Sequence, residues 1–256
     1  MPLGFASSIL TKVAAGAAAL RDAATVTAYG NTQVDTAESK FGGASALFDG
    51  TGDYITADCM ADFTASTALT FECFFLANYD TGSGTVAIMS NRTGGTSNGE
   101  VQMLFRKFDN KVQVNAYGTG AWNANGVGSA LTPNQSGGSF NHFALGRDAS
   151  GNYAVWVNGT RVANGTGWTQ DLSIGGDGNM GIGAHADGTL EFNDGGSTGN
   201  DNGWIDEVRI SAVDRYGVSN SSITVPTSAF TNDTDTRLLL HMDGSDGSTT
   251  FEDDNA

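Results

Sequence analysis

Carboxylates are the commonest side chains in this sequence that could do chemistry, with 28 Asp and Glu residues in all. A retaining glycosidase needs two of them about 5 Å apart, and only residues two or four positions apart share a face of a β-strand. Asp206 and Glu207 are adjacent, so we expect their side chains to point to opposite faces. No Glu-x-Asp-x-Glu pattern occurs. The acids therefore predict no hydrolytic pair, and we expect a protein that is not an enzyme.

The other residues that could take part in catalysis are scattered. The three histidines lie in unrelated segments, namely His142, His185 and His241. Cys73 alternates with Phe71 and Phe75, which is typical of a thiol inside a buried strand. Neither Cys59 nor Cys73 lies in a local protease signature, and no Cys/His cluster has zinc-site spacing. The sequence therefore predicts neither a catalytic thiol nor a zinc site.

Two tryptophans could bind sugar. Trp122 and Trp168 lie in Gly/Asn-rich segments that we expect to be loops. Sugar stacking needs a flat apolar face with polar neighbours. The polar contacts could come from Asn123, Asn125 and Gln170. The alternative is that the two loop tryptophans fold back onto the edge of the domain. Trp156 and Trp204 lie inside strand patterns and are expected in the core.

Composition limits the partners. The chain has 256 residues and a formal net charge of -16, with only 12 Lys and Arg. Nucleic-acid binding needs clustered Lys and Arg, so no nucleic acid and no anionic membrane surface is expected as a partner. No run of 18 apolar residues occurs, so the sequence predicts no membrane-spanning helix. The length and the 39% apolar content suffice for one sizeable core.

Short strands separated by Gly, Asn and Asp turns are predicted from Thr25 onward. Asn158-Gly159 lies between two such strands and is the strongest short-range hairpin signal. The pattern predicts an all-β fold, a two-sheet antiparallel sandwich or jelly roll. The expected strands are Thr25–Tyr29, Ala44–Phe48, Tyr54–Thr56, Leu69–Ala77, Val86–Ser90, Glu100–Lys107, Lys111–Tyr117, Phe140–Asp148, Asn152–Val157, Thr160–Ala163, Met180–Ala184, Trp204–Ser211 and Arg237–His241.

Residues 1–24 differ from the rest of the chain. They are rich in alanine and read as a short helical segment, which Ser7 or Ser8 could cap. A signal peptide is the rival interpretation, but Lys12 interrupts the apolar stretch and no positive region precedes it. We expect an N-terminal helical attachment segment over 1–24, and a jelly-roll domain over 25–256 that includes a C-terminal strand at 237–241.

Five blocks of sequence resemble the laminin-G-like domains of the concanavalin A-like lectin/glucanase superfamily, and they occur in the family's order. They are Lys40–Ile55, Leu69–Phe75, Phe140–Asp148, Tyr153–Gly159 and Gly203–Ile210. The resemblance implies a concanavalin A-like jelly roll. It also implies a calcium site, which carries over onto Asp206. The partner carboxylate would be Asp253 or Asp254 in the tail, or Asp22 if the N-terminus fills that place.

The tail resembles laminin-G-like modules in structural proteins of marine tailed phages, through residues 214–217, 225–233 and 238–244. In those modules the Leu-Leu-Leu-His-Met-Asp-Gly segment usually comes first, whereas here it lies near the C-terminal end. We expect this strand either to fill the first-strand place in its own domain or to add to the edge of a neighbouring copy.

The resemblance implies a non-catalytic protein on the surface of a phage virion, as a capsid decoration or fibre protein or a tail fibre. The N-terminal segment would bind other virion proteins or sister copies in a homo-oligomer, and the jelly roll would bind a cell-surface glycan. The alternative is a secreted, extracellular lectin module that binds carbohydrate with calcium. A glucanase is a third class, disfavoured by the missing acid pair.

Overall fold

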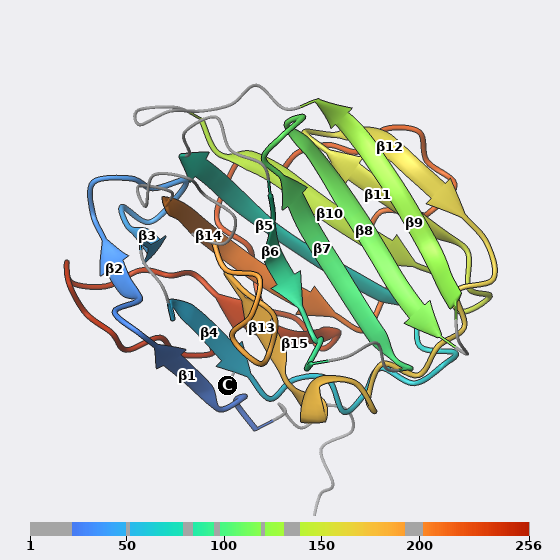
Figure 1. Cartoon of the computed structure of the whole chain (residues 1–256), viewed down its shortest axis with the longest axis horizontal. Helices are drawn as coiled ribbons and strands as arrows, with labels where there is room; N and C mark the ends of the chain where they lie inside the picture. The colour runs from blue at the N-terminus through green and yellow to red at the C-terminus, as the bar shows by residue number, and fades with distance from the viewer. Residues whose placement is uncertain are drawn as a thin grey trace, which may run out of the picture.

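Two antiparallel sheets form the domain in the computed structural model, which describes residues 22–49, 52–78, 84–94, 98–118, 121–130, 139–192 and 202–255. The seven-stranded sheet has the order β1 (Val26–Tyr29), β4 (Tyr54–Ala57), β13 (Met180–Ile182), β6 (Thr85–Ser90), β7 (Glu100–Arg106), β8 (Lys111–Gly118) and β9 (Ala121–Ala130). This arrangement confirms the predicted all-β, two-sheet sandwich (Figure 1).

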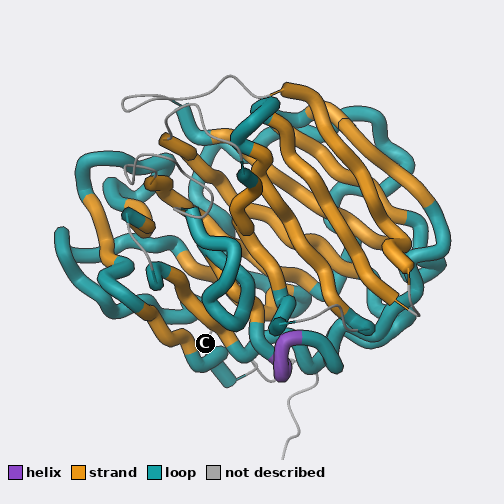
Figure 2. Tube along the Cα trace, viewed as in Figure 1, coloured by secondary structure: helices purple, strands orange, loops and turns teal. Residues whose placement is uncertain are grey.

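The eight-stranded sheet has the order β12 (Thr160–Gly165), β11 (Tyr153–Val157), β10 (Asn141–Arg147), β5 (Leu69–Asn78), β14 (Asn202–Ser211), β3 (Ser45–Phe48) and β2 (Gln33–Asp35), and β15 (Thr236–Leu240) also pairs with β14. Strands and loops make up nearly all of the described chain (Figure 2). The one helical element among the described residues is a 3-10 turn, Gly176–Gly178.

The core lies between the two sheets, as the alternation along β5 illustrates. Phe71, Cys73 and Phe75 point into it and are at most 1% exposed. Burying each such side chain stabilises the fold by roughly 1.5–3 kcal/mol. Cys73 is a free thiol, as expected of a core cysteine. Trp156 and Trp204 are also buried, as the strand patterns predicted, but in two smaller clusters outside the core between the sheets.

The outer face of β5 is buried too, because a covering segment crosses it. Residues 212–235, which connect β14 to β15, run as an irregular strap over the eight-stranded sheet. Phe74 and Leu76 of β5 pack there against Phe230 of the strap. This covering explains why β5 is buried at nine of its ten positions instead of alternating between buried and exposed residues.

The β11–β12 hairpin forms where the sequence predicted it. Asn158 and Gly159 have φ angles of 47° and 83°, the left-handed conformations that a two-residue hairpin turn requires. β15 pairs with β14 of its own chain, with Leu239 opposite Arg209. The C-terminal strand therefore pairs within its own domain, which is the first of the two alternatives that the sequence left open.

The two ends of the described chain meet. The backbone N–H of Ala24 donates a 2.8 Å hydrogen bond to the carboxylate of Asp253. Of the predicted helical segment, residues 1–21 lie outside the described residues, and Asp22 to Ala24 are not helical. No helix within the described ranges is long and apolar enough to span a membrane.

Candidate functional site

A cavity of about 390 Å³ opens beside the C-terminal end of β15. Its lining is Leu240, His241, Met242, Asp243, Ser248, Thr250, Phe251, Glu252 and Asp254. We call it the acidic pocket, because three of its lining residues, Asp243, Glu252 and Asp254, are exposed acids. The residues come from the end of β15 and from the chain that follows it.

The acidic pocket lies near a junction in the sheet. The first part of β14, Gly203–Ile205, pairs with β3, whereas Val208–Ser211 pairs with β15. The register of β14 against β5 shifts between Asp206 and Arg209, and Glu207 has a φ of 53°. An irregularity of this kind re-aims side chains. It places two carboxylates where one neighbouring strand ends and the other begins.

Asp206 is completely buried at this junction. Its Oδ2 accepts hydrogen bonds from the backbone N–H groups of Lys40 at 2.7 Å and Phe41 at 3.1 Å. Its Oδ1 has no hydrogen-bond partner among the described residues. Burial raises the pKa of Asp206 to about 7, against the lowering effect of the two N–H groups, and the charges of Glu207 and Asp243 raise it further.

Glu207 is buried as well, and both of its oxygens have partners. Oε2 accepts the backbone N–H of Phe230 at 2.7 Å, and Oε1 lies 2.9 Å from Nδ1 of His241. Burial raises the pKa of Glu207, although these two partners oppose the shift. Neither Asp206 nor Glu207 lines the acidic pocket. The carboxylates that do face it form a negative surface suited to a cation or a basic group.

The carboxylates expected to hold calcium lie in different settings: Asp206 is buried in β14, whereas Asp254 is exposed in the lining of the acidic pocket. The carboxylate of Asp253 accepts backbone N–H groups from Ala24, Leu239 and Asn255, while Asp22 is exposed. Within the described ranges, no group of three or more His, Cys, Asp or Glu residues could hold a metal ion. The Oδ1 of Asp206, which has no hydrogen-bond partner among the described residues, could still accept a cation. Calcium binding therefore stays a prediction.

Trp168 is not an exposed loop side chain. It is 0% exposed and packs edge-on against Tyr153, with the guanidinium carbon of Arg147 4.9 Å from its ring centre. The Arg147 guanidinium also donates to the backbone carbonyls of Gln170, Thr64 and Thr67. Trp168 and Gln170 thus belong to a clamp that joins two loops to the core. The alternative in which the loop tryptophan folds back applies here, and its ring offers no face to a sugar.

Trp122, Asn123 and Asn125 lie on β9, the edge strand of the seven-stranded sheet. The prediction that they lie on a loop was wrong. Trp122 is opposite Tyr117 and Asn125 is opposite Asn115 in the β8–β9 ladder. Pairing with β8 keeps this segment extended although Asn and Gly have a low propensity for strands. The side chains of β9 lie outside the described residues.

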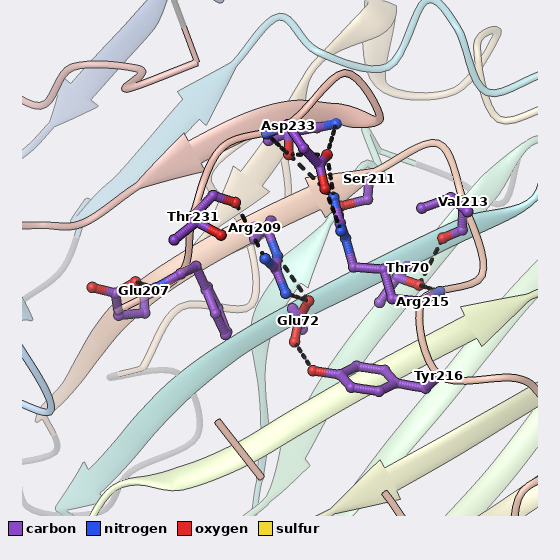
Figure 3. A network of polar contacts seen from close by, with 12 residues as sticks. Thr70, Glu72, Glu207, Arg209, Ser211, Val213, Arg215, Tyr216, Thr231 and Asp233 are labelled. Atoms are coloured by element: carbon purple, nitrogen blue, oxygen red, sulfur yellow. Dashed lines mark hydrogen bonds and ion pairs between the residues drawn. The ribbon is translucent and has the colours of Figure 1, made fainter. Parts of the chain in front are cut away.

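A buried polar network beneath the strap was not predicted (Figure 3). Glu72, in the middle of β5, is 0% exposed and accepts from Arg209 at 2.7 and 3.0 Å and from the hydroxyl of Tyr216 at 2.5 Å. His142 Nε2 lies 3.2 Å from the same carboxylate. Burial would raise the pKa of Glu72, but these partners lower it overall. A lone acid in the apolar run Leu69–Phe75 was the available signal.

Comparisons with known proteins agree with this fold. A family model for the concanavalin A-like lectin/glucanases superfamily matches residues 49–215. Among solved structures, the chain is similar to the botulinum neurotoxin serotype D binding domain, with a TM-score of 0.56 and 11% identity over 77% of this chain and 45% of that one. It is also similar to the binding domain of Paraclostridial Mosquitocidal Protein 1, with a TM-score of 0.55 and 9% identity over 75% and 44%.

A third similar structure concerns botulinum neurotoxin type C, whose cell entry is described as dependent on two ganglioside molecules. Its TM-score is 0.54, with 10% identity over 75% of this chain and 43% of that chain. The chain thus spans less than half the length of these structures, and at such identities the likeness concerns the fold alone. Among curated proteins, none matches this sequence.

Proposed function

This chain belongs to the concanavalin A-like lectin/glucanase superfamily, and from that premise we propose that it is a non-catalytic module that binds carbohydrate. The observation that carries the proposal is the state of the two adjacent acids of β14. Asp206 and Glu207 are both 0% exposed, and neither lines a cavity found beside them. A general acid must reach the glycosidic oxygen of its substrate, which these buried groups do not. The burial of the two β14 acids supports binding rather than hydrolysis by this pair.

The ligand we propose is a glycan on a cell surface. Similarity to the toxin binding domains supports this proposal at the level of the fold, since one of those toxins is described as dependent on gangliosides. The net charge of -16 disfavours nucleic acid and anionic lipid as partners.

We further propose that the module is displayed on a phage virion. The resemblance of residues 214–217, 225–233 and 238–244 to modules of phage structural proteins supports this proposal. Residues 1–24 would attach it to other virion proteins or to sister copies. Ala24 and Asp253 lie together, so such an attachment would leave the opposite end of the domain free to meet a cell.

A glycan array tests the binding proposal. The full chain should bind one or more immobilised glycans, while a reducing-sugar assay on soluble forms of the same glycans should detect no release. Release that depends on Asp206 would contradict the proposal, and so would an array on which nothing binds above a heat-unfolded sample of the same chain.

A calcium-dependent lectin is the second candidate, favoured by the orphaned Oδ1 of Asp206. Ligands of the folded state stabilise it in proportion to the logarithm of their concentration over Kd. Millimolar calcium should then raise the melting temperature by several degrees over a sample in chelator, and Asp206→Asn should abolish the rise. If calcium and chelator give the same melting curve and calorimetry detects no binding, this candidate is excluded.

A further inference from the structure

A second cavity, of about 370 Å³, shares no lining residue with the acidic pocket. Three segments surround it: the β10–β11 turn from Asp148 to Asn152, the end of β12 from Asn164 to Thr166, and the beginning of the strap from Asp214 to Ser219. We call it the polar pocket. Its volume is at the lower end of the roughly 300–1,000 Å³ that is typical of small-molecule sites, which suits a mono- or disaccharide.

The walls of the polar pocket are fixed by the protein itself. Asp148 accepts the backbone N–H groups of Ser150 and Asn152, both at 2.9 Å. Asp214 accepts those of Gly217 at 3.0 Å and Val218 at 2.9 Å. A site whose walls are held in place loses little conformational freedom on binding, and weak ligands such as single sugars depend on that.

Arg161 joins the two sides of the polar pocket. Its Nη1 donates to the backbone carbonyls of Val218 at 3.3 Å and Ser219 at 2.9 Å, and thereby ties the edge strand β12 to the strap. A guanidinium has five N–H donors. Nε and Nη2 of Arg161 make no hydrogen bond with the described residues, so they can donate to a ligand.

An aromatic ring forms part of the lining. Tyr153 of β11 packs edge-on against Trp168, with ring centres 6.1 Å apart, so its orientation is fixed. The neighbouring residue of β12 is Gly165, where a Cβ atom would lie within 2.6 Å of the Tyr153 ring. Glycine is therefore required for β12 to lie against this ring. Tyr153 is only 7% exposed, so its ring forms a fixed apolar base beneath the polar groups, and recognition falls to those groups.

Other polar groups of the pocket are free. Within the described part of the chain, the side chains of Asn164, Thr166 and Ser219 make no hydrogen bond, and all three residues are exposed. Amides and hydroxyls offer both donors and acceptors, which match the alternating donors and acceptors of adjacent sugar hydroxyls. The charged groups are Asp148, Asp214 and Arg161, with a formal sum of one negative charge, so the pocket favours neutral sugars over acidic ones.

We propose that the polar pocket between the β10–β11 turn, the end of β12 and the beginning of the strap binds a neutral saccharide through adjacent hydroxyl groups. This inference rests on the proposed carbohydrate-binding function and assigns it a site. The pocket also suits that role by its place in the molecule. β11 and β12 lie toward the right of Figure 1 along the longest axis, whereas β1 and the C-terminus lie in its left half.

Ligand-observed NMR on the full chain tests the site. The probes are the neutral disaccharides lactose, maltose, mannobiose and chitobiose, with sialyllactose as the acidic comparison. Asn164→Ala removes a free amide, and Thr166→Phe fills the cavity. Both residues are exposed, so folding should be unaffected. Thr250→Ala, a change at an exposed residue of the acidic pocket, is the matched control.

We expect at least one neutral probe to bind, each pocket variant to weaken binding at least about tenfold, and Thr250→Ala to leave it unchanged. Neutral binding that survives both pocket variants would overturn the site but leave the proposed function standing. Binding of sialyllactose alone would overturn the neutral class. Failure of every probe here and on the glycan array would overturn the proposed function together with the site.

Discussion

At the scale of single residues, Asp206 should make the stability of this domain depend on pH. Burial holds its pKa at about 7 in the fold, above the ordinary value of 3.8. The folded chain therefore holds this proton more tightly than the unfolded chain, so the stabilisation present below about pH 4 is lost as pH rises through 7. We expect the melting temperature in chelator to fall between pH 5 and 8.

Asp206→Asn is the variant that isolates this effect. It keeps an oxygen acceptor for Lys40 and Phe41 but cannot ionise, so its melting temperature should fall less over the same pH range. The change in the free energy of unfolding that ionisation of Asp206 causes is at most on the order of 4 kcal/mol. Parallel curves for wild type and variant would show that Asp206 titrates normally.

Arg209 should be among the most sensitive side chains in the buried network. Its replacement by Met leaves the carboxylate of Glu72 buried with fewer partners, and breaking a buried ion pair in this way costs about 3–5 kcal/mol. Urea unfolding of Arg209→Met measures the loss. Arg237→Met is the control, because its pair with Asp62 is near the surface and should contribute no more than about 1 kcal/mol. If the two variants lose equal amounts of unfolding free energy, the buried Arg209–Glu72 pair is no more important than a surface pair.

The burial of a residue could be predicted where it follows from the alternation of its neighbours along a strand. It could not be predicted where burial depends on a segment that is distant in the sequence. Cys73 is in the core as its neighbours indicated. For Trp168 the Gly-rich surroundings indicated a loop but left open whether the ring is exposed or folded back onto the domain. The sequence carries no local sign that Arg147, 21 positions earlier, lies 4.9 Å from its ring centre. The partners of Glu72 come from β10, β14 and the strap, which no spacing rule relates.

At the scale of elements, β15 is the strand that covers the edge of the second half of β14 in the eight-stranded sheet. Leu238, Leu239 and Leu240 are each at most 1% exposed, on alternating faces of the sheet. Leu239→Ala should destabilise the domain by about 2–5 kcal/mol, because it leaves a cavity between the sheet and the strap. Thermal unfolding of this variant provides the measurement.

Truncation before Thr236 extends the same argument. It removes β15 and uncovers the part of β14 from Val208 to Ser211, whose free edge would invite pairing with other chains. A truncated chain should unfold at a lower temperature and aggregate. A truncated protein that melts within a degree or two of the full chain would show that β15 is only an appendage.

Most strands were predictable because each is short and bounded by turn residues. The sequence missed β2, which has three residues and an exposed neighbourhood, and β9, whose Asn and Gly content suggests a loop. The junction in β14 was also missed. A strand pattern cannot reveal that β3 flanks one half of β14 and β15 the other, since β3 pairs with it from about 155 residues earlier and β15 from about 30 residues later.

At the scale of the whole molecule, the two cavities differ in charge and in position. The acidic pocket is formed by the C-terminal chain, which also contacts Ala24 at the beginning of the described fold. The polar pocket is formed by β12 and the strap, toward the other end of the longest axis. A domain attached through its termini would hold the acidic pocket near the attachment and present the polar pocket outward.

Calorimetric titration of the full chain with the best-binding neutral glycan, followed by NMR of the recovered ligand, tests the central claim most directly. The account predicts saturable binding, about tenfold weaker in Asn164→Ala, and recovery of the glycan intact after prolonged incubation. Cleaved glycan, in an amount that falls to background when Asp206 is replaced by Ala, would contradict the claim that this jelly roll binds carbohydrate without hydrolysing it.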